Sequence, residues 1–135
     1  MKRASQAIEI ADLIEKLQFF IQGAEIAGPA SFHRAHLRTD HVELSVRIGR
    51  HVISGTTPQS LDLVDITIAE DWRGRGTLKA ILRWLEQRQP FEGIYVENVL
   101  SRLSNHLRQR GYEEVPGSSP PCFFLRTGQL TAIRA

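Results

Sequence analysis

The strongest constraint on this chain is the segment Asp71 to Thr77, with sequence DWRGRGT, which joins a β-branched run, Leu61 to Ala69, directly to an amphipathic helix opening near Gly76. A helix that begins where a strand stops leaves its first backbone N–H groups unpaired, with the positive end of its dipole behind them. Glycines at positions 74 and 76 allow an anion to approach the backbone closely. The junction therefore predicts an anion-binding turn suited to a phosphate.

The size and charge of the chain predict one ordinary globular domain. The 135 residues, of which 41% are hydrophobic, suffice for one domain with a real core, which we expect to span residues 1–135 with 128–135 as a tail. The 17 basic and 15 acidic residues give a net charge of +2 and are spread along the chain. This small excess does not predict nucleic-acid binding.

Cysteine and histidine usage indicates neither a disulfide nor a metal. The single cysteine, Cys122, excludes an internal disulfide, which is usual for a cytosolic protein. His33 and His36 are three residues apart with no carboxylate or cysteine grouped beside them, so we interpret them as surface or strand histidines. Because no apolar signal core or membrane-spanning stretch is visible either, we expect a cytoplasmic location and no membrane partner.

The first half of the chain predicts one helix followed by antiparallel strands. Apolar residues recur at helical spacing from Ile10 to Ile21, with Ser5 as the expected N-cap and Gly28-Pro29 as the stop. Short β-type runs separated by turn residues then predict a meander with strands at 32–37, 42–48 and 51–54.

The second half predicts a longer strand, two helices and three short strands. In the strand Leu61 to Ala69, alternation fails at Leu63-Val64, and a β-bulge there would restore it. An apolar stripe predicts a helix that ends near Gln89-Pro90. The remaining elements are expected at 93–97, 101–110, 112–115 and 122–125, the second of them a helix followed by a C′ glycine at position 111.

This order of elements, with Arg73-Gly74-Arg75-Gly76 at the strand-to-helix junction, resembles the GNAT family of N-acetyltransferases over nearly the whole chain. In that family the glycine turn reads Gln/Arg-x-x-Gly-x-Gly/Ala and holds the pyrophosphate of acetyl-CoA. A second similarity runs from Val96-Glu97-Asn98 to the segment 107–112, LRQRGY. The resemblance implies an α+β fold: a mixed, mostly antiparallel central sheet, flanked by helices, in which a splayed parallel strand pair forms the CoA cleft.

The resemblance also implies a cofactor site and a reaction. Acetyl-CoA would serve as co-substrate, and a primary amine would attack its thioester directly through a tetrahedral intermediate. The backbone of Ile66 to Ile68 would pair with pantetheine as a pseudo-strand, and the turn would bind phosphate. The expected cofactor-binding residues are Ile66, Thr67, Ile68, Arg73, Gly74, Arg75, Gly76, Thr77, Asn98 and Ser101. Exposed arginines at a helix N-terminus oppose the dipole unless an anion is present, which favours phosphate contact by Arg73 or Arg75.

Several polar residues are candidates for proton transfer. Asp65 follows the suspected bulge and is the first candidate for the general base, although a solvent-facing strand carboxylate is the simpler interpretation. Glu97, at the end of the neighbouring strand, is the second and would act through water. Tyr112 is a candidate acid, but a tyrosine in a strand is more often a core aromatic. For Trp72, the sequence leaves open a lid on the core or an exposed platform.

Two positions depart from the family pattern and keep other functions open. Asp71 stands where the motif has Gln or Arg, which places a carboxylate beside the phosphate site. Leu107 stands where the family often has the tyrosine that protonates the departing thiolate. A non-catalytic binding or regulatory module is therefore one alternative. Another is an acetyltransferase acting on a nucleic-acid-associated amine, with a basic face formed by Arg83, Arg88, Arg102, Arg108 and Arg110.

The acceptor and the oligomeric state are not readable from the sequence. The resemblance implies an acceptor site formed in part by the first helix and the loop after it, here about residues 19–38. This region lacks the several carboxylates that a pocket for a polycation needs, so a small-molecule amine, a lysine or a protein N-terminus stay open as acceptors. A strand at 122–125 on the edge of the sheet would allow pairing into a homodimer.

Overall fold

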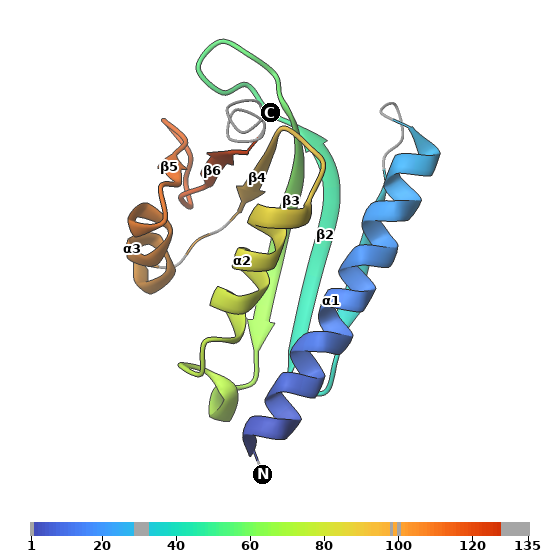
Figure 1. Ribbon diagram of the computed structural model, residues 1–135. Coiled ribbons are helices and arrows are strands. Elements are labelled where there is room, and N and C mark those ends of the chain that lie inside the picture. Colours follow the sequence, from blue (N-terminus) through green and yellow to red (C-terminus); the bar gives the residue numbers. More distant parts are fainter. Residues whose placement is uncertain (1, 29–32, 98, 100, 128–135) are drawn as a thin grey trace.

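A computed structural model describes residues 2–28, 33–97, 99 and 101–127, with the backbone alone described for 2–4, 101 and 102. Helices α1, α2 and α3 accompany a mixed six-stranded sheet of order β1-β2-β3-β4-β6-β5 (Figure 1). This is the α+β fold with a mostly antiparallel sheet that the resemblance implies. The elements are α1 Lys2–Ala27, β1 Arg34–Arg38, β2 Val42–Arg50, β3 Gln59–Ile68, the 3-10 turn Glu70–Trp72, α2 Thr77–Arg88, β4 Gly93–Val96, α3 Ser101–Gln109, β5 Glu113–Glu114 and β6 Phe123–Arg126.

Strands β3 and β4 form a parallel pair that opens at one end. Pairing runs from Ser60 opposite Gly93 to Leu63 opposite Val96, where β4 ends while β3 continues to Ile68. Glu97 still donates its backbone N–H to the carbonyl oxygen of Leu63 at 3.0 Å. Beyond that bond β3 extends without β4 beside it. We call this point the fork, and it confirms the predicted splayed pair.

The predicted β-bulge lies at the fork. On β2, Ser45 pairs with Asp65 and the next residue, Val46, pairs with Leu63, so Val64 is the extra residue of β3. One extra residue shifts the side-chain alternation by one position. Leu63 before the bulge and Ile66 after it therefore both pack on the same hydrophobic core.

One hydrophobic core joins the three helices to one face of the sheet. Leu13 and Leu17 of α1, Leu85 of α2 and Leu107 of α3 are each 0% exposed and belong to this core. Figure 1 shows α1 and α2 on the same side of the sheet. The opposite face carries polar side chains from β1, β2 and β3, and we call it the polar face: Arg34, His36, Arg38, Glu43, Ser45, Arg47, Asp62, Asp65 and Thr67.

Three local predictions are wrong. Helix α1 begins at Lys2, so Ser5 lies within it; Gln6 binds the turn after β3, and this tertiary contact supports the first helical turns. Residues 51–54 form no strand, because Ser54 and Gly55 adopt positive φ angles of 49° and 80° in a loop closed by an isolated Ile53–Thr56 bridge.

The third correction concerns the edge of the sheet. Strand β6, expected at 122–125 on the edge, lies between β4 and β5. Both of its sides are thus paired, and the expected dimer contact through this strand loses its basis. The sheet ends instead at β1 and β5. None of the helices in the described part of the chain combines the length and apolar character needed to cross a bilayer.

Truncation of Leu17 tests the docking of α1. Leu17→Ala should lower the free energy of unfolding by about 2–5 kcal/mol, because it removes a fully buried side chain. Ile8→Ala is the control on the same helix, since Ile8 is 69% exposed, and it should change stability by less than about 0.5 kcal/mol. Urea unfolding measures both variants, and equal losses would contradict the packing of α1 described above.

Candidate functional site

The glycine turn after β3 presents an open backbone at the N-terminus of α2. Gly74 and Gly76 adopt left-handed φ angles of 76° and 79°, and Gly76 directly precedes Thr77, the first residue of α2. A Cβ at either glycine would meet nothing within 4 Å, so the backbone conformation, not crowding, requires glycine. The first N–H groups of a helix lack intrahelical partners. Open space therefore lies in front of unpaired donors, as an anion site needs.

The two arginines of this turn have internal contacts. Arg73 donates from Nε to the carbonyl oxygen of Ile68 at 3.0 Å, and its side chain is exposed. The Arg75 guanidinium lies 5.3 Å from the ring centroid of Trp72, a cation–π contact. Both cations thus stay at the turn, close to the helix N-terminus. Asp71 is exposed in the 3-10 turn.

Trp72 anchors the glycine turn to the rest of the fold. It is 6% exposed and stacks on His41, with ring centroids 3.9 Å apart and 12° between the ring planes. Glu9 of α1, itself 8% exposed, accepts hydrogen bonds from the backbone N–H of His41 at 2.7 Å and from the Thr39 hydroxyl at 2.6 Å, and its second oxygen lies 2.7 Å from His41 Nδ1. Trp72 is therefore buried under the turn and is not an exposed platform.

The chain before β3 thus positions the turn from two sides. Gln6 donates from Nε2 to the carbonyl oxygen of Arg75 at 2.7 Å and to Thr77 Oγ1 at 3.0 Å.

Burial by itself would raise the pKa of Glu9, but the hydrogen bonds from Thr39 and His41 outweigh it, and the pKa is lowered. Sequence reasoning missed this anchor. The available signal was an acid at position 9, four residues before Leu13 and so on the apolar stripe of the helix.

A second polar cluster lies at the fork, on the polar face. Asp62 of β3 is 0% exposed and accepts hydrogen bonds from Ser60 Oγ at 2.5 Å and Arg47 Nε at 2.9 Å, and His51 Nε2 lies 2.8 Å from it. The carboxylate rests against Gly49, where a Cβ would overlap Oδ2. A buried carboxylate is costly unless its oxygens are paired, and here three donors pair them.

Arg47 connects Asp62 to Glu97. Its Nη2 donates to a Glu97 oxygen, so one guanidinium binds a carboxylate from β3 and one from the end of β4. Burial acts to lower the pKa of Arg47, but the hydrogen bond and charge of Asp62, and then those of Glu97, raise it. His51, Asp62 and Glu97 each have a possible metal-ligand atom within 4.8 Å of the others. The Arg47 guanidinium already binds the two carboxylates of this group and supplies the positive charge beside them.

Tyr95 of β4 completes this cluster. The His51 ring stacks on it, with centroids 3.6 Å apart and 6° between the planes. Burial raises the pKa of Tyr95, and the neighbouring Cys122, Glu97 and Asp62 raise it further. We call Arg47, His51, Asp62, Tyr95 and Glu97 the fork cluster. Stacking on Tyr95 sets the plane of the His51 imidazole, and the contact with Asp62 sets the direction in which Nε2 points.

The three predicted catalytic residues lie in different environments. Glu97 belongs to the fork cluster. Asp65 is exposed on β3, one residue beyond the bulge. Tyr112 is 3% exposed in the core, where its hydroxyl donates to Glu86 of α2 at 2.9 Å. Burial raises the pKa of Tyr112, and the charge of Glu86 and this hydrogen bond add to the effect.

Most of the predicted cofactor residues follow one another along the chain from the fork to the glycine turn. Ile66, Thr67 and Ile68 occupy the part of β3 that extends past β4. Arg73 to Thr77 then form the glycine turn and the start of α2. Asn98 lies outside the described residues, as does the side chain of Ser101, whose backbone begins α3. Leu107, at the position of the family's usual acid, is fully buried in the core.

Comparison with known proteins bears on the fold. No protein-family model and no curated protein sequence matches the chain. Among solved structures, a mutant AtaT toxin with a C-terminal AtaR antitoxin segment and acetyl-CoA aligns at a TM-score of 0.55 and 12% identity, over 70% of this chain and 64% of that one. AtaT complexed with acetyl-methionyl-tRNAfMet aligns at 0.52 and 13%, over 70% and 67%.

A third structure, the KacTA–DNA complex, covers more of the chain. It aligns at a TM-score of 0.55 and 11% identity over 89% of this chain and 84% of its own. Identities this low define the fold alone. The fold is that of the GNAT acetyltransferases, as the resemblance predicts.

The anchor of the glycine turn makes a pH-dependent prediction. Because the folded-state pKa of Glu9 is lowered, its contribution to stability is present above the unfolded-state pKa, about 4.3, and is lost as pH falls through the folded-state value. Glu9→Gln should cost about 1–3 kcal/mol at pH 7, and the difference from wild type should shrink towards pH 3. Urea unfolding at pH 7 and pH 3 measures both.

Glu15→Gln is the matched control for Glu9→Gln, because Glu15 is exposed on the same helix. It should leave the stability at both pH values close to that of wild type. A Glu9→Gln difference that stays constant between pH 7 and pH 3 would show that the Glu9 carboxylate does not act through its charge.

Proposed function

We propose that this protein is an N-acetyltransferase that moves the acetyl group of acetyl-CoA to a primary amine. The observation that carries the proposal is the geometry of β3, which leads from an open fork at Val64 directly to a glycine turn at the start of α2. The first feature offers unpaired backbone to an extended ligand and the second offers donors to an anion. Acetyl-CoA has both parts, a pantetheine arm and a pyrophosphate.

The cofactor would bind along β3. Pantetheine would pair with the backbone of Ile66 to Ile68, where β4 has ended, and the pyrophosphate would lie on Gly74, Gly76 and the first N–H groups of α2. Arg73 and Arg75 would supply positive charge beside it. The fold neighbour AtaT was solved with acetyl-CoA, which supports this assignment. The cytoplasm, where acetyl-CoA is available, is the expected location.

The reaction forms a C–N bond and breaks the C–S bond of the thioester. An ammonium must first lose a proton, the amine then attacks the acetyl carbonyl, and the departing thiolate gains a proton. The fork cluster lies where β3 and β4 separate, which is where the thioester would sit. In the tautomer of His51 that donates Nε2–H to Asp62, Nδ1 is the ring nitrogen that accepts a proton, and Glu97 is a second acceptor that would act through water.

Two other groups stay as candidates for proton transfer. Asp65 is exposed on the polar face just beyond the bulge, within the part of the chain that would face the acceptor. Tyr112 is bound to Glu86, which favours a structural role over protonation of the thiolate. With Leu107 in the core at the family's usual acid position, we assign the thiolate's proton to water.

A second candidate function is acetylation of an amine carried by a nucleic acid. The fold neighbour AtaT was solved with acetyl-methionyl-tRNAfMet, and this favours an RNA-linked amine. The expected basic face offers weaker support, because Arg108 pairs with Glu114 at 2.6 Å and Arg110 pairs with Glu86. A non-catalytic module that binds CoA without turnover is the remaining alternative, and its main support is Asp71, an acid in the 3-10 turn just before the glycine turn.

Cofactor binding is the first test. Calorimetric titration with acetyl-CoA and with CoA should show saturable binding, which Gly76→Glu should weaken at least about tenfold, or about 1.4 kcal/mol, because a side chain and a negative charge enter the phosphate site. Gly117→Glu is the matched control, since Gly117 has a φ of 76° and also has open space around it, but lies in the β5–β6 loop.

The two outcomes of the titration separate clearly. Weaker acetyl-CoA binding in Gly76→Glu but not in Gly117→Glu supports the glycine turn as the pyrophosphate site. No binding by the wild-type protein at millimolar acetyl-CoA would contradict the acetyltransferase assignment. Equal effects of the two variants would show that backbone strain, and not the position of the charge, reduces binding.

Acetyl transfer by variants of the fork cluster is the second test. His51→Gln keeps a donor for Asp62 but removes the proton acceptor, so kcat should fall by about 10²–10⁴-fold while the Kd for acetyl-CoA stays unchanged. Glu97→Gln and Asp65→Asn, assayed in parallel across pH, assign the remaining acceptors. Loss of kcat in Asp65→Asn alone would move the general base from the fork cluster to the exposed carboxylate.

A further inference from the structure

Two arginines occupy directly opposed positions on the polar face. In the antiparallel pair of β1 and β2, Arg34 is directly opposite Arg47. Like charges at directly opposed positions destabilise a sheet. The same two strands also contain the ordinary arrangement, because Arg38 is opposite Glu43 and forms an ion pair with it at 2.8 Å. The Arg34–Arg47 pair is therefore the exception among the opposed charges of these two strands.

Only one of these two cations is compensated within the described part of the chain. Arg47 binds Asp62 and Glu97. Arg34 is exposed, and no described carboxylate lies within ion-pair distance of it. Arg47 with its two carboxylates is therefore not a net cation, and the guanidinium that has no described carboxylate partner is that of Arg34. An external anion beside Arg34 would accept hydrogen bonds from this guanidinium.

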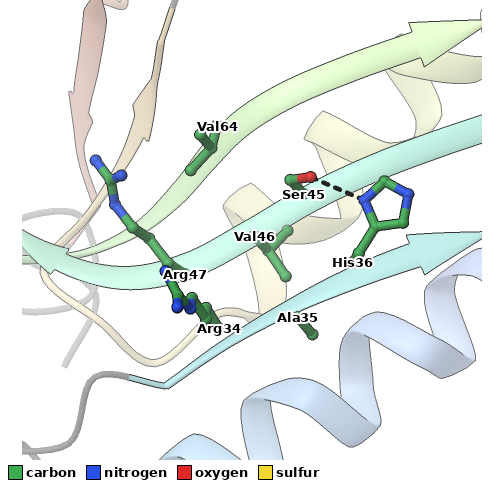
Figure 2. A pocket seen from close by; sticks show the side chains of 7 residues that line it. All are labelled: Arg34, Ala35, His36, Ser45, Val46, Arg47 and Val64. Atoms are coloured by element: carbon green, nitrogen blue, oxygen red, sulfur yellow. Dashed lines mark hydrogen bonds between the residues drawn. The ribbon is translucent and has the colours of Figure 1, made fainter.

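A hollow on the polar face lies beside this pair. Its volume is about 460 Å³, and Arg34, His36, Ser45, Arg47 and Val64 are among the residues that line it (Figure 2). Figure 2 shows the His36 ring turned to Ser45, with Nδ1 2.9 Å from the hydroxyl oxygen. A smaller hollow of about 330 Å³ shares Arg34 and Arg47 and adds His33. Since Val64 is the bulge residue, the larger hollow reaches the fork.

We propose that this hollow binds an anionic group, a phosphate or a carboxylate, on the acceptor molecule, whose amine then reaches the thioester at the fork. The inference rests on the proposed function and adds the class of its substrate: small amines that also carry a negative charge. Arg34 is the specificity residue, because Arg47 is already engaged by two carboxylates. The acids of the fork cluster would attract the ammonium end of the same molecule.

The surroundings of the hollow favour a small anion over a nucleic acid. Glu43, Asp62, Asp65 and Glu97 lie on the same face or at the fork, around the two arginines. A phosphodiester chain laid across this face would meet several of these carboxylates, whereas one anionic group beside Arg34 on β1 would be separated by β2 from Asp62 and Asp65 on β3.

Acetylation of matched acceptors tests the inference. O-phosphoethanolamine is compared with ethanolamine, and β-alanine with β-alaninamide, so that phosphate and carboxylate are each compared with a neutral partner. The anionic member of at least one pair should have a kcat/KM at least about tenfold higher, mainly through a lower KM. Arg34→Gln should remove this preference. Arg38→Gln, on the same strand and face but already paired with Glu43, should keep it.

A binding measurement separates failure of this inference from failure of the proposed function. Binding of inorganic phosphate, measured by titration, requires no turnover. Arg34→Gln should raise the Kd for phosphate at least about fivefold, and Arg38→Gln should leave this Kd unchanged. If acetyl-CoA fails to bind, the acetyltransferase assignment fails, and an Arg34-dependent phosphate site still supports the anion site. Equal use of neutral and anionic acceptors, or equal effects of the two variants, would overturn the inference.

Competition assigns the source of the anion. A short single-stranded RNA oligonucleotide is added to the O-phosphoethanolamine assay. Weak competition that is independent of Arg34 supports a small acceptor. Competition stronger than that of inorganic phosphate, and lost in Arg34→Gln, would assign the hollow to a nucleic acid and overturn the small-acceptor proposal.

Discussion

The extra residue at Val64 is the constraint on which the rest of the structure depends. It lets β3 keep its apolar side chains in the core on both sides of the bulge, at Leu63 and at Ile66, although the backbone changes register there. Because β4 ends opposite Leu63, the second half of β3 packs its apolar side chains against the core and has a backbone edge with no strand partner among the described residues, where the Ile68 carbonyl oxygen accepts from Arg73. A strand that is held by its side chains and still has free donors and acceptors can pair with a ligand as if with another strand.

Strand β2 and the residue before it connect the two ends of that free segment. His41, immediately before β2, stacks on Trp72 and is held by Glu9, which sets the position of the glycine turn. Six residues further on, Arg47 binds Asp62 and Glu97 and sets the position of the fork. The distance between the glycine turn and the fork cluster is therefore governed by one strand, and both anchors use charged groups that are mostly buried. This explains the carboxylates at two buried positions, Glu9 on α1 and Asp62 on β3, where apolar side chains are usual.

The two faces of the sheet have separate tasks. The helices and the core lie on one face, where Leu107 and Tyr112 take part in packing and Tyr112 binds Glu86. The polar face has the fork cluster and the hollow beside Arg34, so the chemistry of proton transfer and of acceptor binding would be on the side opposite the helices. The two departures from the family motif fit this division: Leu107 fills the core, and Asp71 is exposed outside the glycine turn.

The fork of β3 and β4 was expected from the resemblance to the GNAT family. The features that the sequence by itself determined depend on local pattern: the order of most elements, the bulge at Leu63-Val64 and the glycine turn before α2. Periodicity and glycine placement encode these directly. Only the tertiary structure decided that β6 lies inside the sheet, that residues 51–54 form a loop, and that His51 and Asp62 meet Glu97. These facts depend on which distant segments become neighbours, and no local pattern of charge or hydrophobicity specifies such pairs.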